Sequence, residues 1–274
     1  MIKFENTEVV GWEAAIRGMR NPMNSWEKSD SGYCCGNKKC SLIPGCDLAC
    51  DIPNYLIGQN DHDLMMSLRN AGTDHRKFMR MITVYVDITA PLYWWKEFDT
   101  YKVGTVANSC STMHKIHEKE FTIDDFSCEH LIDEPIYIHD GFDSKEERVI
   151  PSCLLKDTIT TLNACRNKYL ETKSKPMKEE SKRAELMKKY WWQMIQLLPS
   201  SYNQKRTVML NYEVLANIYK SRKNHKLDEW SIGFMGWIES LPYSELICGP
   251  EFLRRELYVG IDLANGDDMK GGFE

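Results

Sequence analysis

The segment from Met81 to His114, MITVYVDITAPLYWWKEFDTYKVGTVANSCSTMH, decides the fold that the sequence predicts. Its first part alternates between aliphatic side chains and polar or aromatic ones, and this period of two predicts a strand with one buried face. Thr89 can cap a following helix, and Pro91 suits a first helical turn, which tolerates a missing N–H. The aliphatic face of the strand consists of Ile82, Val84, Val86 and Ile88.

A helix and then a polar loop are expected after this strand. Leu92, Trp95 and Phe98 recur at helical spacing, and Trp94 widens their apolar stripe. From Val103 onward the residues are mostly small and polar, so the loop offers backbone and hydroxyl donors to a ligand. The alternative interpretation is a buried helix followed by an ordinary polar loop that binds nothing.

Length and composition indicate one large globular domain. The chain has 274 residues, of which 42% are hydrophobic and 27% charged, as in ordinary soluble proteins. We expect a single domain over residues 1–263 and a flexible tail over 264–274. The net charge of −5 lacks the basic excess of a non-specific nucleic-acid binder, so no nucleic-acid partner is expected.

The sequence also predicts the compartment. No apolar run reaches the length that spans a bilayer, and the first ten residues lack the apolar core of a secretory signal. We therefore expect a cytoplasmic protein without a membrane partner, in which the ten cysteines are mostly reduced.

Five of these cysteines cluster in a short segment, at Cys34, Cys35, Cys40, Cys46 and Cys50. Zinc sites need about four ligands, commonly supplied by CxxC-type pairs, and such pairs are absent here. We interpret residues 30–54 as a loop insertion with incidental thiols; a zinc site there is the alternative. His114 and His117 form an HxxH pair without a third ligand, which favours two surface histidines over a metal site.

Helical patterns fill most of the remaining chain. A first helix contains Trp12 and ends near Arg17 and Arg20, which either cap carbonyls or meet an anionic ligand. Asp61 can cap a second helix, which ends before Gly72. Further helices are predicted around residues 159–169, 184–198, 211–222 and 230–241, with a short extended piece at 208–210. We expect Asn211 to cap the helix that follows it.

Two segments of the chain resemble the flavin-dependent thymidylate synthases. In DITAPLYWWKEFDTYKVGTVANSCSTMH, at residues 87–114, an alanine–proline pair and a helix precede the place of the family's Arg-His-Arg signature and its serine. LPSSYNQKRTVMLNYEVLANIYKSR, at residues 198–222, is similar to the family's leucine–proline, asparagine, asparagine and arginine segment. The matching residues there are Leu198, Pro199, Asn211, Asn217 and Arg222.

The signature itself differs from the family pattern. Thr100, Tyr101 and Lys102 stand in place of Arg-His-Arg. The signature serine falls on Cys110 without a gap, or on Ser111 with one extra residue, and we prefer Ser111 because Asn108 then also matches. Elsewhere in the signature, Met113 and His114 replace an arginine–tyrosine pair, and Glu97 replaces the glutamine of the preceding helix.

The resemblance implies an α+β fold, a mixed α/β subunit with a small antiparallel sheet and long helices. It also implies a homotetramer with sites shared between subunits. The implied reaction transfers a one-carbon unit from methylenetetrahydrofolate to carbon 5 of a pyrimidine nucleoside monophosphate such as dUMP. In that reaction FAD is the cofactor, and NADPH supplies the hydride that reduces it.

The resemblance also assigns roles to residues. Arg222, Ser111 and Glu97 are the implied catalytic residues, and together with Ser109 they bind the nucleotide. Serine hydroxyls and a forked guanidinium suit its phosphate. The residues implied to bind the cofactor are Lys102, Asn108, Asn211, Asn217 and His75.

Two substitutions leave alternatives open. A glutamine donates and accepts hydrogen bonds, whereas an ionised glutamate only accepts, so Glu97 at a base favours the amino group of dCMP over the carbonyl of dUMP. The alternative is a surface glutamate paired with Lys102. Cys110 is either a thiolate nucleophile or a small loop residue. For the whole chain, the alternative to an enzyme is a non-catalytic nucleotide-binding protein that retains the fold but not FAD.

Overall fold

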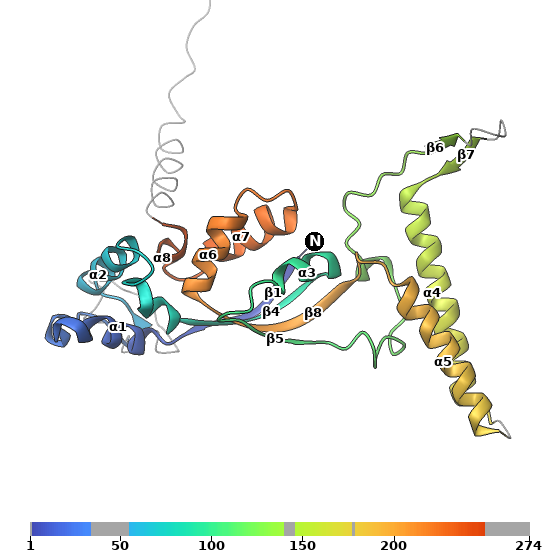
Figure 1. Cartoon of the computed structure of the whole chain (residues 1–274), viewed down its shortest axis with the longest axis horizontal. Coiled ribbons are helices and arrows are strands. Elements are labelled where there is room, and N and C mark those ends of the chain that lie inside the picture. The colour runs from blue at the N-terminus through green and yellow to red at the C-terminus, as the bar shows by residue number, and fades with distance from the viewer. Residues whose placement is uncertain (1, 34–54, 140–145, 177–178, 250–274) are drawn as a thin grey trace, which may run out of the picture. The chain divides into compact units, whose positions relative to one another are not determined.

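The computed structural model describes residues 2–33, 55–139, 146–176 and 179–249 (Figure 1). It confirms the α+β class, with helices and small antiparallel sheets. The cysteine cluster of the predicted insertion and the predicted tail over 264–274 lie outside the described residues.

The described chain packs as two compact units. Unit 1 is built mainly from Ile88–Thr100 and Asn108–Thr207, and unit 2 mainly from Phe4–Asp87, Tyr101–Ala107 and the residues from Val208 onward. Four strands pass from one unit into the other along the chain, so the units are not consecutive in sequence. The single domain expected over residues 1–263 stays a prediction.

Four strands form the largest sheet, in the order β1-β4-β8-β5. They are β1 (Lys3–Val10), β4 (Thr83–Pro91), β8 (Asn203–Asn211) and β5 (Val106–Ser109). Two further sheets consist of one antiparallel pair of strands each. In the first, β2 (Gly32–Tyr33) pairs with β3 (Tyr55–Leu56) so that Tyr33 lies opposite Tyr55. In the second, β6 (Ile136–His139) pairs with β7 (Glu146–Val149).

The helices divide between the units. Unit 1 contains α3 (Leu92–Phe98), α4 (Pro151–Ser174), α5 (Glu180–Leu197) and the 3-10 turn η4 (Ile123–Asp125). Unit 2 contains α1 (Trp12–Arg20), α2 (Gln59–Asn70), α6 (Tyr212–Arg222), α7 (Met235–Glu239) and α8 (Glu245–Cys248). It also contains the 3-10 turns η1 (Asn21–Met23), η2 (Trp26–Lys28) and η3 (Arg76–Arg80), and the π-helical turn η5 (Glu229–Phe234).

Strand β4 confirms the strand predicted over residues 82–88. Val84, Val86 and Ile88 are fully buried, whereas Tyr85 between them is 44% exposed, as the period of two requires. The predicted extended piece at 208–210 is likewise confirmed as part of the longer strand β8, with Val208 buried.

The predicted cap at Thr89 is wrong, because β4 continues to Pro91 and α3 begins at Leu92. No side chain caps this helix. Its first amides instead donate to main-chain carbonyls of unit 1: Leu92 N to Tyr202 O and Tyr93 N to Ser200 O, both at 3.0 Å. The orphan N–H groups at the helix start are thereby satisfied by a segment about a hundred residues away in sequence, which makes a capping side chain unnecessary.

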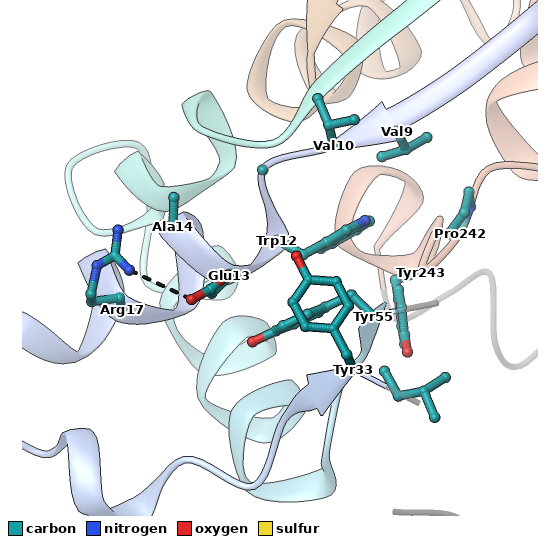
Figure 2. Close-up of a pocket in the computed structure, with 12 residues that line it drawn as sticks. Val9, Val10, Trp12, Glu13, Ala14, Arg17, Tyr33, Tyr55, Pro242 and Tyr243 are labelled. Carbon is teal, nitrogen blue, oxygen red and sulfur yellow. Dashed lines mark ion pairs between the residues drawn. The ribbon is translucent and has the colours of Figure 1, made fainter. Parts of the chain in front are cut away.

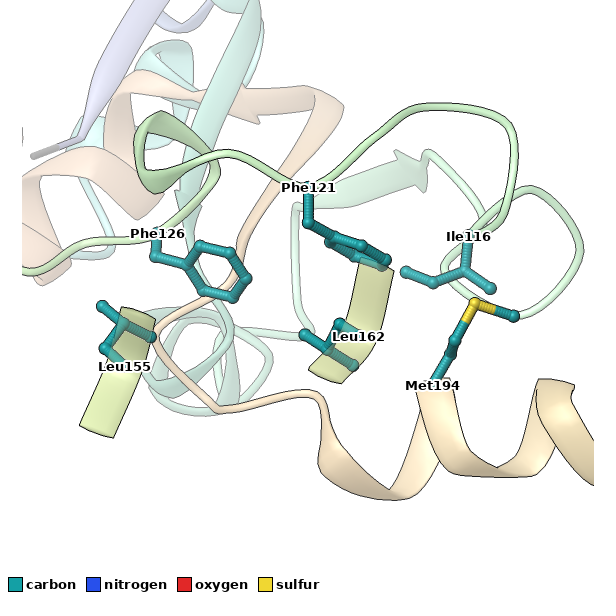
Figure 3. Packing of buried hydrophobic residues seen from close by; sticks show 6 residues of the cluster. All are labelled: Ile116, Phe121, Phe126, Leu155, Leu162 and Met194. Carbon is teal, nitrogen blue, oxygen red and sulfur yellow. The ribbon is translucent and has the colours of Figure 1, made fainter. Parts of the chain in front are cut away.

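The core of unit 1 lies between a loop and two long helices. Helices α4 and α5 run side by side (Figure 1), and α4 is longer than the helix predicted over 159–169. Ile116, Phe121 and Phe126 of the preceding loop pack on them, as Figure 3 shows. The helices contribute Leu155 and Leu162 from α4 and Met194 from α5.

The predicted cap at Asp61 is also wrong. Asp61 lies inside α2, and Asp30 caps this helix instead, by accepting from Asn60 N at 2.9 Å and from Asp61 N at 3.1 Å. The carboxylate of Asp61 is fully buried and accepts from Arg20 Nε at 2.6 Å. Arg20, one of the two arginines near the end of α1, is therefore a structural residue of unit 2.

Candidate functional site

The clearest candidate site in unit 2 lies around α6. Asn211 caps this helix as predicted, since its Oδ1 accepts from Val214 N at 3.0 Å. The segment Tyr101–Ala107 lies close to the same helix. At Gly104 φ is +77°, and a Cβ atom there would lie 2.8 Å from Asn211 Nδ2, so glycine is needed for this close approach.

At the other end of α6, two aromatic rings hold the guanidinium of Arg222. Its Nε donates to Tyr101 Oη at 2.8 Å, and that hydroxyl is also 3.0 Å from Ser221 Oγ. Arg222 Cζ lies 5.0 Å from the ring centroid of Trp230 and 5.6 Å from that of Tyr101. Because Trp230 is fully buried, it gives the half-buried guanidinium a fixed surface to stack on.

A group of charges joins the same helix to η3. Glu213 is buried and forms ion pairs with Arg76, at 3.6 Å, and with Arg80. Arg76 Nη2 also donates to Asn217 Oδ1 at 2.8 Å. His75, at the start of η3, is exposed, as is Lys102. One carboxylate therefore offsets the charge of Arg76 and Arg80, while Lys102 and His75 stay in contact with solvent.

In unit 1, a carbonyl and a side chain of strand β8 hold the loop of residues 108–111, here called the serine loop. Cys110 N donates to Lys205 O at 2.9 Å, and Cys110 O accepts from Gln204 Nε2 at 2.8 Å. The same buried glutamine accepts from Arg206 Nε at 3.0 Å, and Arg206 lies 4.2 Å from the ring centroid of Trp95. This chain of contacts gives an exposed loop a rigid support.

The predicted serines lie on that supported loop. Ser109 and Asn108 end strand β5, and both are exposed, as are Cys110 and Ser111. Ser111 Oγ accepts from His114 N at 3.0 Å, which leaves its hydroxyl hydrogen to donate elsewhere. Glu97 is half-buried on α3.

The structure therefore divides the predicted residues between the units. Unit 1 contains Glu97, Asn108, Ser109 and Ser111, and unit 2 contains His75, Lys102, Asn211, Asn217 and Arg222. Their catalytic, cofactor-binding and nucleotide-binding roles stay predictions.

Sequence reasoning missed four contacts of these residues. Tyr101 and Trp230 hold Arg222, and Gln204 and Arg206 support the serine loop. For Tyr101 the sequence did contain a signal, because this tyrosine stands at a position of the family's Arg-His-Arg signature. Trp230 falls in the helix predicted around residues 230–241, and nothing in that pattern points to Arg222. The position of Gln204 in a strand likewise does not reveal that its side chain donates to Cys110 O.

The histidine pair differs from its prediction at His117. His117 is buried, contrary to the surface position predicted for it, and its ring lies 4.6 Å from that of Tyr169. Burial, with a contribution from Lys173, lowers the pKa of His117 and favours the neutral ring. Across the described ranges, no group of three or more His, Cys, Asp or Glu residues could hold a metal ion. None of the helices within these ranges combines the length and the hydrophobicity that a membrane span needs.

Comparison with known proteins shows a shared fold. No model of a known protein family matches the sequence, and no curated protein matches it. Two solved structures of ThyX, a flavin-dependent thymidylate synthase from Helicobacter pylori complexed with FAD and dUMP, are similar in structure. One has a TM-score of 0.54 and 12% identity, covering 93% of this chain and 100% of its own. The other has a TM-score of 0.52 and 12% identity, covering 90% of this chain and 99% of its own. The chain therefore has the α+β fold of these synthases, at an identity that shows the fold alone.

Proposed function

We propose that this chain is a flavin-dependent enzyme that transfers a one-carbon unit from methylenetetrahydrofolate to carbon 5 of a pyrimidine nucleoside monophosphate. The guanidinium of Arg222, held by Tyr101 and Trp230, is the observation that carries the proposal. The fold adds support, because two solved structures with a similar fold contain FAD and dUMP. NADPH as the source of hydride and a homotetramer as the working assembly are part of the same proposal.

In this proposal Arg222 neutralises the nucleotide. A guanidinium presents several donors in a rigid plane and stays charged, which suits an anionic phosphate. The hydrogen bond to Tyr101 and the stacking on Trp230 fix that plane before the nucleotide arrives, so less conformational entropy is lost on binding. For Ser109 and Ser111 of unit 1, the proposal keeps the role that the resemblance implies, as hydroxyl donors to a nucleotide.

FAD, when bound, supplies the hydride that reduces the transferred one-carbon unit. The donors present fit its anionic part: Lys102 and His75 are exposed cations or donors, and Asn211 keeps an amide group beside Gly104. Arg76 and Arg80 fit less well, because Glu213 already pairs with both. Lys102 is therefore the side chain on which flavin binding depends most.

The flavin part of the proposal is tested by replacing Lys102. The full-length protein is expected to bind FAD and to show a flavin absorption spectrum. Lys102→Gln removes one charge-assisted contact and is expected to weaken FAD binding about tenfold. Lys220→Gln, which removes an exposed charge from α6, serves as the matched control and is expected to leave the affinity unchanged. Equal affinities for both variants would contradict the role of Lys102.

A non-catalytic nucleotide-binding protein is the second candidate. It is favoured by the replacement of Arg-His-Arg by Thr100, Tyr101 and Lys102, which removes positive charge where the family resemblance places it. Protein that binds dUMP or dCMP but stays colourless after incubation with FAD would support this candidate and contradict the enzyme.

Glu97 is proposed to set the choice of base. An ionised carboxylate accepts but does not donate, so it favours the amino group of cytosine over the carbonyl of uracil. We expect titration calorimetry to show dCMP binding at least about tenfold more tightly than dUMP, with Glu97→Gln reducing or reversing that preference. Glu120→Gln, an exposed substitution in unit 1, is expected to preserve it. Tight binding of dUMP with no binding of dCMP would contradict this assignment.

A further inference from the structure

Unit 2 contains a large cavity that shares no residue with the site proposed above. Its volume is about 730 Å³, within the range of roughly 300–1,000 Å³ found for small-molecule sites. Figure 2 shows four aromatic side chains around it, and two charged residues of α1 stand beside them. The aromatic residues are Trp12, Tyr33, Tyr55 and Tyr243, and the charged residues are Glu13 and Arg17.

Local structure holds the aromatic walls. Tyr33 and Tyr55 face each other across the β2–β3 pair, with ring centroids 5.0 Å apart and planes at 83°. Trp12 and Tyr243 form a second edge-on pair at 5.3 Å, and Tyr243 Oη accepts from Ile57 N at 3.0 Å. These contacts place aromatic surface around an open volume without filling it.

The entry of the chain into α1 depends on a glycine. Gly11 has a φ of +97°, and a Cβ atom there would lie 2.1 Å from Met81 O. A side chain at this position would clash with the backbone, so glycine allows the sharp change from β1 to α1. That turn brings Trp12 and Glu13, the first residues of the helix, to the cavity.

The polar side of the cavity offers a donor beside an acceptor. Glu13 Oε1 and Arg17 Nη1 are 3.8 Å apart, one helical turn from each other, and their side chains are 58% and 65% exposed. Such an exposed pair is weak and exchanges readily with a ligand. Within the described residues, the hydroxyls of Tyr33 and Tyr55 form no hydrogen bond. Burial, with a contribution from Asp61, raises the pKa of Tyr55 to about 12, so its hydroxyl keeps its proton at neutral pH.

We propose that this cavity binds a purine nucleoside, with the fused rings against the tyrosines and the hydrogen-bonding edge of the base at Glu13 and Arg17. A purine presents neighbouring donor and acceptor atoms in the ring plane, which matches a carboxylate beside a guanidinium. Aromatic side chains bind bases through their π-faces. A second cavity of about 220 Å³, which shares Glu13, Arg17 and Tyr55, leaves room for the sugar.

Other classes of small molecule fit this cavity less well. An alkylammonium ion suits an aromatic cage but is repelled by Arg17, and a simple anion is repelled by Glu13. A hydrocarbon would cover both charges without giving either a hydrogen bond, which is costly. A single-ring pyrimidine would cover less of the aromatic wall than a purine does. Because the cavity contains no residue of the proposed enzyme site, this inference stands independently of that proposal.

Titration calorimetry on the full-length protein with adenosine and guanosine tests the proposal. At least one of these nucleosides is expected to bind. Tyr33→Ala, at a side chain that is 60% exposed, is expected to weaken its binding about tenfold or more. Glu13→Ala removes the acceptor for the base and is expected to weaken binding about fivefold or more. Tyr85→Ala removes a tyrosine of unit 2 that is 44% exposed and lies outside the cavity, and is expected to have no effect.

Three results would overturn the proposal. The first is no binding of either nucleoside at about millimolar concentration, the weakest range still measurable in this experiment. The second is an equal loss of affinity in Tyr33→Ala and the control Tyr85→Ala. The third is tighter binding of choline, the alkylammonium probe, than of either nucleoside.

Discussion

Arg222→Ala is expected to weaken the binding of dUMP or dCMP by about tenfold to more than a hundredfold. The substitution removes a charge-assisted contact to the phosphate, of a kind that contributes about 1.5–3 kcal/mol. It also leaves the Tyr101 hydroxyl without the Nε donor that it contacts at 2.8 Å. Titration calorimetry with both nucleotides measures the change. The same loss is expected for both, because the phosphate is common to them.

Two further variants separate charge from geometry. Lys223→Ala removes an exposed positive charge from the next position in the chain, and is expected to change the affinity by less than about twofold, since exposed charges are screened by solvent and salt. Arg222→Lys keeps the charge but loses the planar fork and the stacking on Trp230, so partial weakening is expected. Equal effects of Arg222→Ala and Lys223→Ala would show that Arg222 acts only through net charge, and would remove it from the nucleotide site.

Tyr101 connects this prediction to the change in the family signature. A tyrosine in this position is uncharged, and it accepts from the guanidinium of Arg222 while its ring lies near Trp230. Tyr101 therefore supplies no positive charge itself; it orients the charge of Arg222, which comes from α6. Under the proposed function, Tyr101 therefore positions the guanidinium that is to bind the nucleotide.

Local pattern predicted the elements of the fold well and their ends poorly. The period of two over residues 82–88 and the cap at Asn211 depend on neighbours in sequence, and both are confirmed. The start of α3 was misplaced because carbonyls of residues 200 and 202 satisfy its first amides. No pattern near Thr89 carries that information, since the partners are far away in the chain.

In the candidate site, too, contacts between residues far apart in the chain could not be predicted from local sequence. The resemblance found Arg222, but the aromatic support from Tyr101 and Trp230 comes from segments that are separate in sequence. The aromatic cavity is a stronger case, because β2, β3, α1 and the segment before α8 each supply part of its wall. Each of these residues has an ordinary local explanation as a strand, helix or turn residue, so only the assembled structure reveals the cavity.

Asp61 illustrates a side chain whose importance could not be seen from local sequence, and it carries the largest expected effect on stability. Its Oδ1 accepts from Arg20 Nε at 2.6 Å, and its Oδ2 accepts from the hydroxyls of Ser29 and Ser31, also at 2.6 Å. Arg20 in turn donates to the carbonyls of Ser25 and Lys28. One fully buried carboxylate therefore joins α1, α2 and the chain between them.

Asp61→Ala is expected to lower the free energy of unfolding of unit 2 by about 3–5 kcal/mol, because it leaves the guanidinium of Arg20 buried without its counter-charge. Urea denaturation followed by circular dichroism measures this change. Asp63→Ala removes an exposed carboxylate from the same helix and is the matched control, expected to alter stability by less than about 0.5 kcal/mol. Similar losses in both variants would show that the buried pair contributes nothing beyond helix surface charge.

The pH dependence of stability gives the Asp61 assignment a second, independent test. Burial by itself raises the pKa of this carboxyl, but hydrogen bonds from Ser29, Ser31 and Arg20 outweigh burial, so the pKa is lowered. A carboxyl with a lowered pKa stabilises the folded state above its unfolded pKa, near about 4, and loses that contribution as the pH falls through the folded value. The stability difference between the wild type and Asp61→Asn is therefore expected to be full at pH 7 and to shrink on acidification below about pH 4. A difference that stays constant down to the acid transition would show that the ionised carboxylate is not the stabilising species.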